Sequence, residues 1–239
     1  MEGKADIREA ALARRDAIPL PDRERKSALV CERLLAELGP VTGKAVAVYA
    51  AMGSEVSLGP FIHEAYAQGA RVCFPCMTRA QEPFGGVPPQ GREEGETLQA
   101  YAGPGSVPPQ DVAEGASSHG RKARKGVPQE MAFREVPQEH HEAGGVPFIE
   151  GPLRPHPADS PALDGFSLVS PSGIDVVVVP MVAFDLHLNR LGYGGGNYDR
   201  FLPTLRPDAI VVGVAFMEQQ VPHVPVEGHD RPLPSIISA

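Results

Sequence analysis

The sequence predicts an α/β fold, a single three-layer domain over residues 1–239 with a mostly parallel sheet flanked by helices. Short runs of branched apolar residues, typical of buried parallel strands, alternate along the chain with segments of helical periodicity. A strand, a helix and a second strand follow one another within residues 45–74, and this order implies a right-handed parallel crossover. Residues 79–148 break the pattern, and we expect them to form a flexible low-complexity insertion within the domain.

Each expected element follows from a local pattern. In chain order, we expect helices at 4–16, 21–38 and 58–67 and strands at 45–49, 71–74, 174–179, 209–216 and 236–237. The second helix opens at Pro21 and Asp22, and Pro75 should close the second strand. The apolar stripe expected along the second helix consists of Ala28, Leu29, Leu34, Leu35 and Leu38.

Residues 79–148 are rich in proline and glycine, and short pieces such as GGVPPQ and GVPQE recur without a fixed period. Such a segment cannot bury enough apolar surface to form a core. A compact domain does not normally contain so long a structureless loop. We therefore interpret the segment as an insertion and not as a second domain.

The composition limits the class of partner. The net charge of −8 does not favour nucleic acid or an anionic membrane. The N-terminal MEGKADIREA lacks an apolar signal region, and no stretch reaches the length that spans a membrane. We expect a cytoplasmic protein that acts as a monomer on a small molecule.

The three cysteines do not suggest a disulfide framework. Cys73 and Cys76 form a C-x-x-C, but the second pair that a structural zinc site would need is missing from the sequence. A redox pair normally lies at the start of a helix, and no helix signal follows Cys76. We interpret Cys73 as a buried strand residue.

The most informative stretch is residues 180–202, PMVAFDLHLNRLGYGGGNYDRFL, which follows an expected strand. It contains a loop with glycine at 192, 194, 195 and 196, and Asn197 is a plausible N-cap for a following helix. Glycines let backbone N–H groups approach a phosphate, and a helix start adds partial positive charge. The spacing is neither a Walker loop nor a dinucleotide fingerprint, and a tight surface turn explains it about as well.

The complete string is more specific than its glycines. F-D-x-x-x-N-R-L-G-Y-G-G-G-N-Y-D-R-F-L closely resembles the signature of the 5-formyltetrahydrofolate cyclo-ligase family, also called methenyltetrahydrofolate synthetases. Further family patterns are matched by the K-x-x-x-R of Lys4 and Arg8, by Y-x-x-M-x-x-E-V at 49–56 and by P-x-E-x-H-D at 225–230. The resemblance covers residues 4–76 and 174–238.

The resemblance implies a role for each matching residue. Contacts with ATP are implied for Lys4, Arg8, Arg190, Leu191, Gly192, Tyr193, Gly194, Gly195, Gly196, Asn197 and Tyr198. Contacts with the folate are implied for Ala50, Met52, Glu55, Tyr193, Gly194, Gly195, Gly196 and Asn197, with added apolar contact from Met131 and Phe133. Asp199 and Asp230 are implied to hold Mg²⁺, and Lys4 and Arg190 to act in catalysis. Without the resemblance, Lys4 and Arg8 would be part of a solvated helix face and Glu55 an exposed carboxylate.

The implied reaction is the ATP- and Mg²⁺-dependent cyclisation of 5-formyltetrahydrofolate to 5,10-methenyltetrahydrofolate, through a phosphorylated formyl group (an iminium phosphate), with release of ADP and phosphate. One residue departs from the family, because Asn197 stands where an aromatic residue is common. A second hypothesis is therefore a non-catalytic member that binds nucleotide or folate and acts on a partner protein through its insertion. A third, a sugar-phosphate isomerase, explains the phosphate loop but not a magnesium pair.

Overall fold

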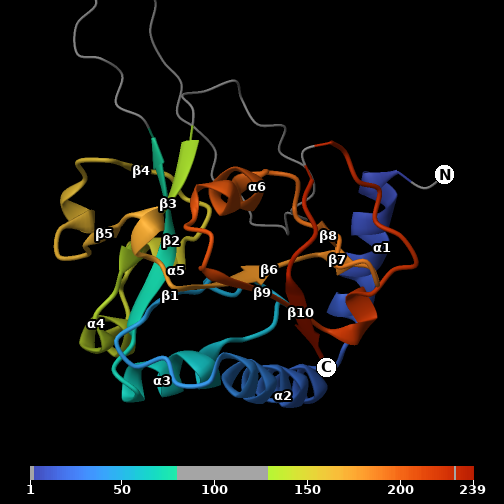
Figure 1. Ribbon diagram of the computed structural model, residues 1–239, viewed down its shortest axis with the longest axis horizontal. Coiled ribbons are helices and arrows are strands. Elements are labelled where there is room, and N and C mark those ends of the chain that lie inside the picture. Colours follow the sequence, from blue (N-terminus) through green and yellow to red (C-terminus); the bar gives the residue numbers. More distant parts are fainter. Residues whose placement is uncertain (1–2, 80–128, 229) are drawn as a thin grey trace, which may run out of the picture.

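The computed structural model describes residues 3–79, 129–228 and 230–239, and its centre is an eight-stranded sheet (Figure 1). The strand order is β10-β9-β6-β1-β2-β3-β5, and β4 pairs with β2. The strands are β1 (Ala45–Ala47), β2 (Arg71–Arg79), β3 (Gln129–Glu135), β4 (His156–Pro157), β5 (Leu168–Val169), β6 (Val176–Pro180), β9 (Ile210–Ala215) and β10 (Ser235–Ser238). The five strands from β10 to β2 are parallel, and β3 and β5 are antiparallel. The predicted α/β class with a mostly parallel sheet is confirmed.

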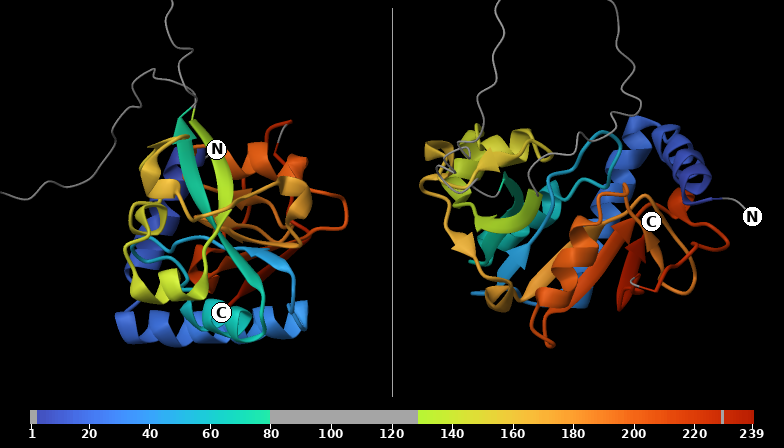
Figure 2. Two further views of the ribbon diagram at one scale, coloured as in Figure 1. Left: turned by 90° about the vertical axis from the view of Figure 1, so that its left-hand side faces the viewer. Right: turned by 90° about the horizontal axis from the view of Figure 1, so that it is seen from above.

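Helices cover both faces of the sheet, as the continuous burial of its central strands β1 and β6 requires. The helices are α1 (Lys4–Asp16), α2 (Leu20–Leu38), α3 (Gly59–Ala67), α4 (Gln138–Ala143), α5 (Pro147–Glu150) and α6 (Asn197–Phe201). In β6, Val176 and Val178 join the core under α2 and α3, whereas Val177 and Val179 join the core that contains Phe201 of α6. Figures 1 and 2 show α2 and α3 on one side of the sheet and α6 on the other.

The first helix is held by a small second sheet. This sheet pairs β7 (Ala183–Phe184) with β8 (Arg190–Leu191) in antiparallel register. Ile7 and Ala11 of α1 pack against Val182, Leu191 and Val224 in a separate apolar cluster. The packing brings the N-terminus of the chain beside segments more than 180 residues away, and Figure 2 shows α1 next to the C-terminal loops.

Two expected details of the N-terminal half are wrong. β2 continues through Pro75 to Arg79, because the β2 edge that faces β1 has no partner strand between Cys73 and Thr78. A proline is tolerated at such an unpaired position. The buried stripe of α2 is Ser27, Val30, Cys31, Leu34 and Leu38, whereas Ala28 and Leu29 are exposed. Helical geometry explains the difference, since the i, i+3, i+4, i+7 series that starts at Ser27 faces the core.

The segment expected to be a flexible insertion, 79–148, meets the described residues only at its two ends. Residues 129–148 form β3, α4 and the start of α5, and they bury Phe133, Val136, Val146 and Phe148. β3 pairs with β2 over seven residues. This C-terminal end of the segment therefore belongs to the packed fold, while residues 80–128 lie outside the described residues.

The C-x-x-C cysteines point to opposite faces of β2. Cys73 packs in the core that contains α6 residues, and Cys76 packs in the core under α2 and α3. Burial raises the pKa of the Cys73 thiol to about 12. Both thiols are free and buried, as expected for strand residues and not for a redox pair. Within the described ranges, no helix is long and apolar enough to cross a membrane.

Candidate active site

The glycine loop lies at the edge of the sheet where the parallel strands end. The segments that follow β1, β6 and β9 include Glu55, residues 192–196 and Asp230, respectively. Because the carboxyl ends of parallel strands share one edge, these three segments converge there, as in other open α/β folds. Side chains of α1 bond to all three segments.

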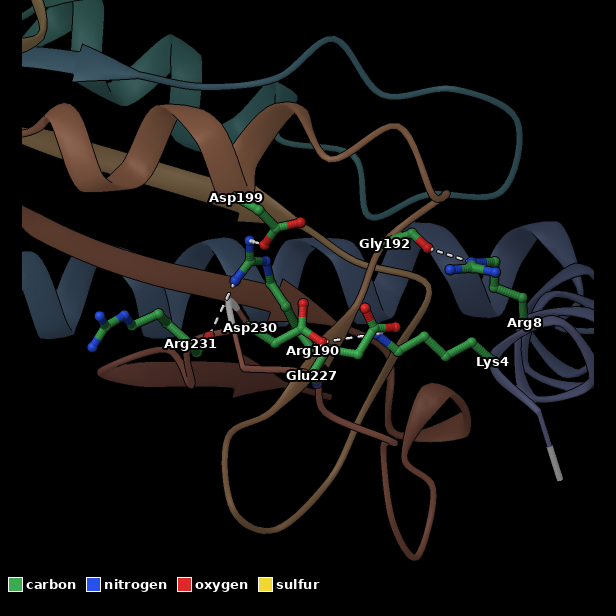
Figure 3. A network of polar contacts seen from close by, with 8 residues as sticks. All are labelled: Lys4, Arg8, Arg190, Gly192, Asp199, Glu227, Asp230 and Arg231. Atoms are coloured by element: carbon green, nitrogen blue, oxygen red, sulfur yellow. Dashed lines mark hydrogen bonds and ion pairs between the residues drawn. The ribbon is translucent and has the colours of Figure 1, made fainter. Parts of the chain in front are cut away.

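Arg8 ties the glycine loop to α1. Its Nε donates a hydrogen bond of 2.7 Å to the carbonyl oxygen of Gly192 (Figure 3). Gly194 has φ of +96°, and a Cβ placed there would lie 3.6 Å from the Arg8 Nη2 atom. A glycine suits this position because L residues rarely adopt that backbone conformation. The guanidinium of Arg8 thus lies directly against the loop.

Lys4 joins α1 to the loop that contains Asp230. Its Nζ atom lies 2.8 Å from Asp230 Oδ2 and 2.9 Å from Glu227 Oε1 (Figure 3). The hydrogen bond to Asp230 is the main cause that raises the pKa of Lys4, and it outweighs the opposing effect of burial. The ammonium group is therefore charged at neutral pH.

Arg190 and Asp199 form a second ion pair, between β8 and α6. The Arg190 side chain is 6% exposed, its Nη2 bonds Asp199 Oδ1, and its Nη1 donates to the carbonyl oxygen of Arg231 at 3.3 Å. A cavity of about 320 Å³ adjoins the pair, lined also by Leu202, Val211 and the 231–234 segment. Arg190 thus connects the carboxylate of Asp199 to the residue after Asp230.

The pair of carboxylates fits a magnesium ion in its donor chemistry. Asp199 and Asp230 are both bonded to cations, and Arg190 links Asp199 to the backbone next to Asp230. Mg²⁺ takes oxygen ligands, commonly one or two carboxylates with water and phosphate oxygens. Among the described residues, no group of three or more His, Cys, Asp or Glu side chains could hold a metal by itself. A magnesium ion here would need oxygens from a ligand.

Glu55 is buried and not exposed, so the alternative of a solvated carboxylate is wrong. It is 8% exposed, and its Oε2 accepts a hydrogen bond of 2.7 Å from the backbone N–H of Met52. Burial raises the pKa of Glu55, and the Met52 N–H, the Tyr193 hydroxyl and the charge of Arg15 lower it in part. Its Oε1 atom is buried and has no hydrogen-bond partner among the residues that the structure describes. An unpaired buried acceptor costs about 1–3 kcal/mol.

Arg15 is a residue that the sequence reasoning missed. It is 4% exposed, with Nε 2.8 Å from Ser54 Oγ and Nη2 2.9 Å from the Tyr193 hydroxyl. It therefore joins α1, the Glu55 loop and the glycine loop. The signal was present in the sequence, because Lys4, Arg8 and Arg15 recur at i, i+4 and i+11 on one helix face.

Asn197 is not the N-cap of α6. Gly196, with φ of +63°, holds that position, and Asn197 is the first helical residue. Its Nδ2 lies 3.7 Å from Met77 Sδ and its Oδ1 accepts a hydrogen bond of 2.7 Å from Arg200. Its amide is thus used in contacts to β2 and within α6. Since α6 has only five residues, its dipole contributes little positive charge to the loop.

Tyr198 connects the two halves of the site electrostatically. Burial raises the pKa of its hydroxyl, the charge of Glu55 raises it further, and Arg190 lowers it. The hydroxyl is buried and unpaired within the described part of the chain. Tyr198 packs on the same core as Met131 and Phe133, and the Phe133 ring lies 4.8 Å from that of Phe201. Met131 and Phe133, for which the resemblance implied apolar contact, both lie in β3.

The other residues implied for the folate lie less centrally. Ala50 packs against the core under α2 and α3, on the other side of the sheet from α6. Met52 contributes its backbone N–H to Glu55. The folate contacts of Ala50, Met131 and Phe133 therefore stay predictions.

Asp185 fixes the turn that leads into β8, and the sequence reasoning gave it no role. The carboxylate is fully buried and accepts hydrogen bonds from the N–H groups of His187, Asn189 and Val224 and from the Asn189 side chain. Burial would raise the pKa of Asp185, but these donors outweigh it and hold the pKa below its ordinary value. Leu188 in this turn has φ of +63°. Asp185 thus positions Arg190 and the glycine loop.

Comparison with known proteins identifies the relatives of this site. Residues 155–239 match the sequence model of the 5-formyltetrahydrofolate cyclo-ligase family. This match confirms the resemblance, and residues 155–239 are similar to the cyclo-ligases. The matched segment contains the glycine loop, Arg190, Asp199 and Asp230.

Curated cyclo-ligases align with part of the chain. The Escherichia coli K12 enzyme is 42% identical over 79 residues, 33% of this chain and 43% of that protein. The Haemophilus influenzae enzyme is 40% identical over 78 residues, 32% of this chain and 42% of that protein. The Saccharomyces cerevisiae enzyme is 37% identical over 70 residues, 27% of this chain and 33% of that protein. The alignments thus span less than half the length of these relatives.

Two solved structures share the fold over nearly the whole chain. The 5,10-methenyltetrahydrofolate synthetase of Mycoplasma pneumoniae has a TM-score of 0.61 at 19% identity, covering 99% of this chain and 98% of that one. The synthetase of Aquifex aeolicus has a TM-score of 0.58 at 21% identity, covering 98% and 89%. At this identity the likeness establishes the fold, and it extends beyond the residues 155–239 that match the family model.

Proposed function

We propose that the protein catalyses the ATP- and Mg²⁺-dependent cyclisation of 5-formyltetrahydrofolate to 5,10-methenyltetrahydrofolate, with release of ADP and phosphate. One observation carries the proposal: Lys4 and Arg8 of α1 bond directly to the glycine loop and the Asp230 loop, which lie in the segment that matches the cyclo-ligase family. The site thus joins cations from one end of the chain to a glycine loop and carboxylates from the other.

Arg8, Lys4 and Arg190 would hold the triphosphate of ATP together with the backbone N–H groups of residues 192–198. Phosphoryl transfer asks a protein mainly to position the reactants and to neutralise charge. Both Lys4 and Arg190 are bonded to carboxylates, so a phosphate oxygen can replace one of those partners. We assign Lys4 and Arg190 to stabilising the charge on the phosphoryl group during its transfer.

Asp199 and Asp230 would hold Mg²⁺ with phosphate oxygens and water completing its ligands. Bound there, the ion would neutralise phosphate charge and orient the terminal phosphate. Before the ligands bind, Arg190 holds Asp199 and Lys4 holds Asp230, so the two carboxylates are already positioned without a third acidic ligand.

The folate would lie on the Glu55 side of the loop, with its formyl oxygen toward the terminal phosphate. In the first step the formyl oxygen bonds the γ-phosphorus and ADP leaves. In the second step N10 attacks the formyl carbon, the C–O bond to phosphate breaks, and N10 loses its proton. The product is the methenyl ring with inorganic phosphate. Tyr198, influenced by both Glu55 and Arg190, lies where the two substrates would meet.

The proposal is tested by supplying the purified protein with Mg-ATP and 5-formyltetrahydrofolate while measuring methenyltetrahydrofolate absorbance and ADP. We expect the two products in about equal amounts, and a strong loss of both in Lys4→Met. Intact nucleotide binding with no methenyl product would instead support the non-catalytic alternative. The presence of Lys4, Arg8, Arg190, Asp199 and Asp230 together argues against that alternative, since the residues implied for phosphoryl transfer are all retained.

A further inference from the structure

The side chain of Arg15 makes only part of the hydrogen bonds that it can make. Nε donates to Ser54 and Nη2 to Tyr193, while Nη1 is buried without a hydrogen-bond partner within residues 3–79, 129–228 and 230–239. The residue is 96% buried, so water does not readily supply the missing acceptor. A guanidinium held at two of its nitrogens therefore has a buried donor left over.

A buried acceptor is left over beside it. Glu55 follows Ser54 in the chain, and its Oε1 has no partner of hydrogen-bond geometry in the described part of the structure. The Tyr193 hydroxyl is near enough to lower the Glu55 pKa as a donor, but it can supply only one hydrogen to a carboxylate that accepts several. Arg15 and Glu55 influence each other electrostatically, yet their unpaired atoms do not bond each other. The Tyr198 hydroxyl, influenced by the same Glu55 charge, is also buried and unpaired. Buried polar groups are nearly always satisfied in proteins, so three such atoms in one cluster indicate a ligand that satisfies them.

The leftover groups have a definite polarity. One edge of a 2-amino-4-oxopteridine presents an acceptor, the 4-oxo oxygen, next to two donors, N3–H and the 2-amino group. A guanidinium N–H complements the acceptor, and a carboxylate complements the donors. A purely structural arginine would need no further acceptor.

We propose that Arg15 is a specificity-determining residue that donates from Nη1 to the 4-oxo oxygen of the pterin, while Glu55 accepts from the adjacent N–H groups. This inference rests on the proposed folate substrate. Arg15 also holds Tyr193 of the glycine loop and Ser54 of the Glu55 loop, so a pterin bound to it is fixed relative to the nucleotide side of the site.

The test compares the affinity of 5-formyltetrahydrofolate with that of its analogue in which an amino group replaces the 4-oxo group. Wild type should prefer the 4-oxo compound, because the analogue presents a donor to the Arg15 donor and its N3 has no hydrogen for Glu55. Arg15→Met should lower the affinity for the 4-oxo compound on the order of 10- to 100-fold. It should leave the affinity for the 4-amino analogue unchanged or increased.

Two controls distinguish direct recognition of the pterin by Arg15 from a structural role of Arg15 in the site. Arg14→Gln alters the neighbouring exposed arginine, whose Nε bonds the Glu218 carbonyl oxygen, and should keep the wild-type preference. Ser54→Ala removes a bonding partner of Arg15 and leaves Nη1 in place. It should change both affinities alike and so preserve their ratio. If Arg15→Met does not fold, Arg15→Lys, which retains a charge but loses the guanidinium fork, should reduce the preference.

Each outcome decides the point. A parallel loss of both affinities in Arg15→Met would show a supporting role only and overturn the inference, as would no loss of either. If wild type binds and cyclises 5-formyltetrahydrofolate but the ratio does not respond to Arg15, the inference fails and the proposed function stands. If wild type neither binds nor cyclises the compound, the proposed function itself fails.

Discussion

Replacing Gly194 by alanine tests whether the glycine loop needs its observed backbone. Gly194 has φ of +96°, and its added Cβ would lie at an ordinary contact distance of 3.6 Å from Arg8. The cost is therefore one of backbone conformation and not of collision. A left-handed conformation costs an L residue about 1–2 kcal/mol.

Gly192→Ala is the matched control in the same loop. Its φ lies outside the left-handed range, and a Cβ there would meet no atom within 4 Å. Alanine at such a position leaves stability unchanged or increases it by about 0.4–1 kcal/mol, because the unfolded chain loses freedom. The two variants should therefore differ by about 1–3 kcal/mol.

The difference is measured by thermal unfolding of both variants without ligand. For a chain of this length, 1 kcal/mol corresponds to about 2–4 °C in Tm. Gly194→Ala should unfold at least about 2 °C below Gly192→Ala, and Mg-ATP should stabilise it less, because the loop N–H groups are displaced. Equal Tm values with equal stabilisation by Mg-ATP would refute the described loop conformation and its assignment to phosphate.

Three further variants test the groups around the loop. Asp185→Asn replaces an acceptor of four N–H bonds with a group that brings its own donors, and it should lower the free energy of unfolding in urea by about 2–4 kcal/mol. Glu55→Gln should raise Tm at pH 7 but weaken folate binding about 10-fold or more. Burial raises the pKa of Glu55 above 4.5. The contribution of protonated Glu55 to the free energy of unfolding is therefore fully present below pH 4.5 and is lost as pH rises through the folded pKa. The Glu55→Gln variant should not show this loss. Lys4→Met should lower kcat about 10²- to 10³-fold in the coupled ADP assay, because it removes a charge opposite the phosphates.

Specific outcomes would contradict these three expectations. Unchanged urea stability in Asp185→Asn would mean that the turn does not depend on the carboxylate. If the stability of Glu55→Gln had the same pH dependence as that of wild type, the group with the raised pKa would not be Glu55. A Lys4→Met enzyme with normal kcat would remove Lys4 from the phosphate site.

The sequence predicted those parts of the fold that depend on local pattern. Two such local signals are the branched apolar residues that form β6 and β9 and the helical periodicity of α1 and α3. The structure contains these elements near the expected bounds. Residues 129–148 were missed because their surroundings are low in complexity, although Phe133 and Phe148 alone bury two large rings. Pro75 was misread because the tolerance of a strand for proline depends on an absent neighbour, which is not encoded locally.

Lys4, Arg8 and the glycine loop could be selected as candidate site residues from the sequence, since they occur in short motifs. The spacing of Arg15 from Lys4 and Arg8 places it on the same helix face, but its role was missed because its partners, Ser54 and Tyr193, are 39 and 178 residues away along the chain. Asn197 was assigned as a cap from its residue type, but the positive φ of Gly196 gives the cap position to the glycine. Long-range contacts and backbone conformation thus decided what residue types alone did not.

The central claim is that the formyl oxygen receives the terminal phosphoryl group. It is tested most directly with 5-formyltetrahydrofolate labelled with ¹⁸O in the formyl group, incubated with Mg-ATP and the protein. Mass spectrometry of the released phosphate should find one ¹⁸O atom per methenyltetrahydrofolate formed. Unlabelled phosphate, with the ¹⁸O found in water, would contradict the account.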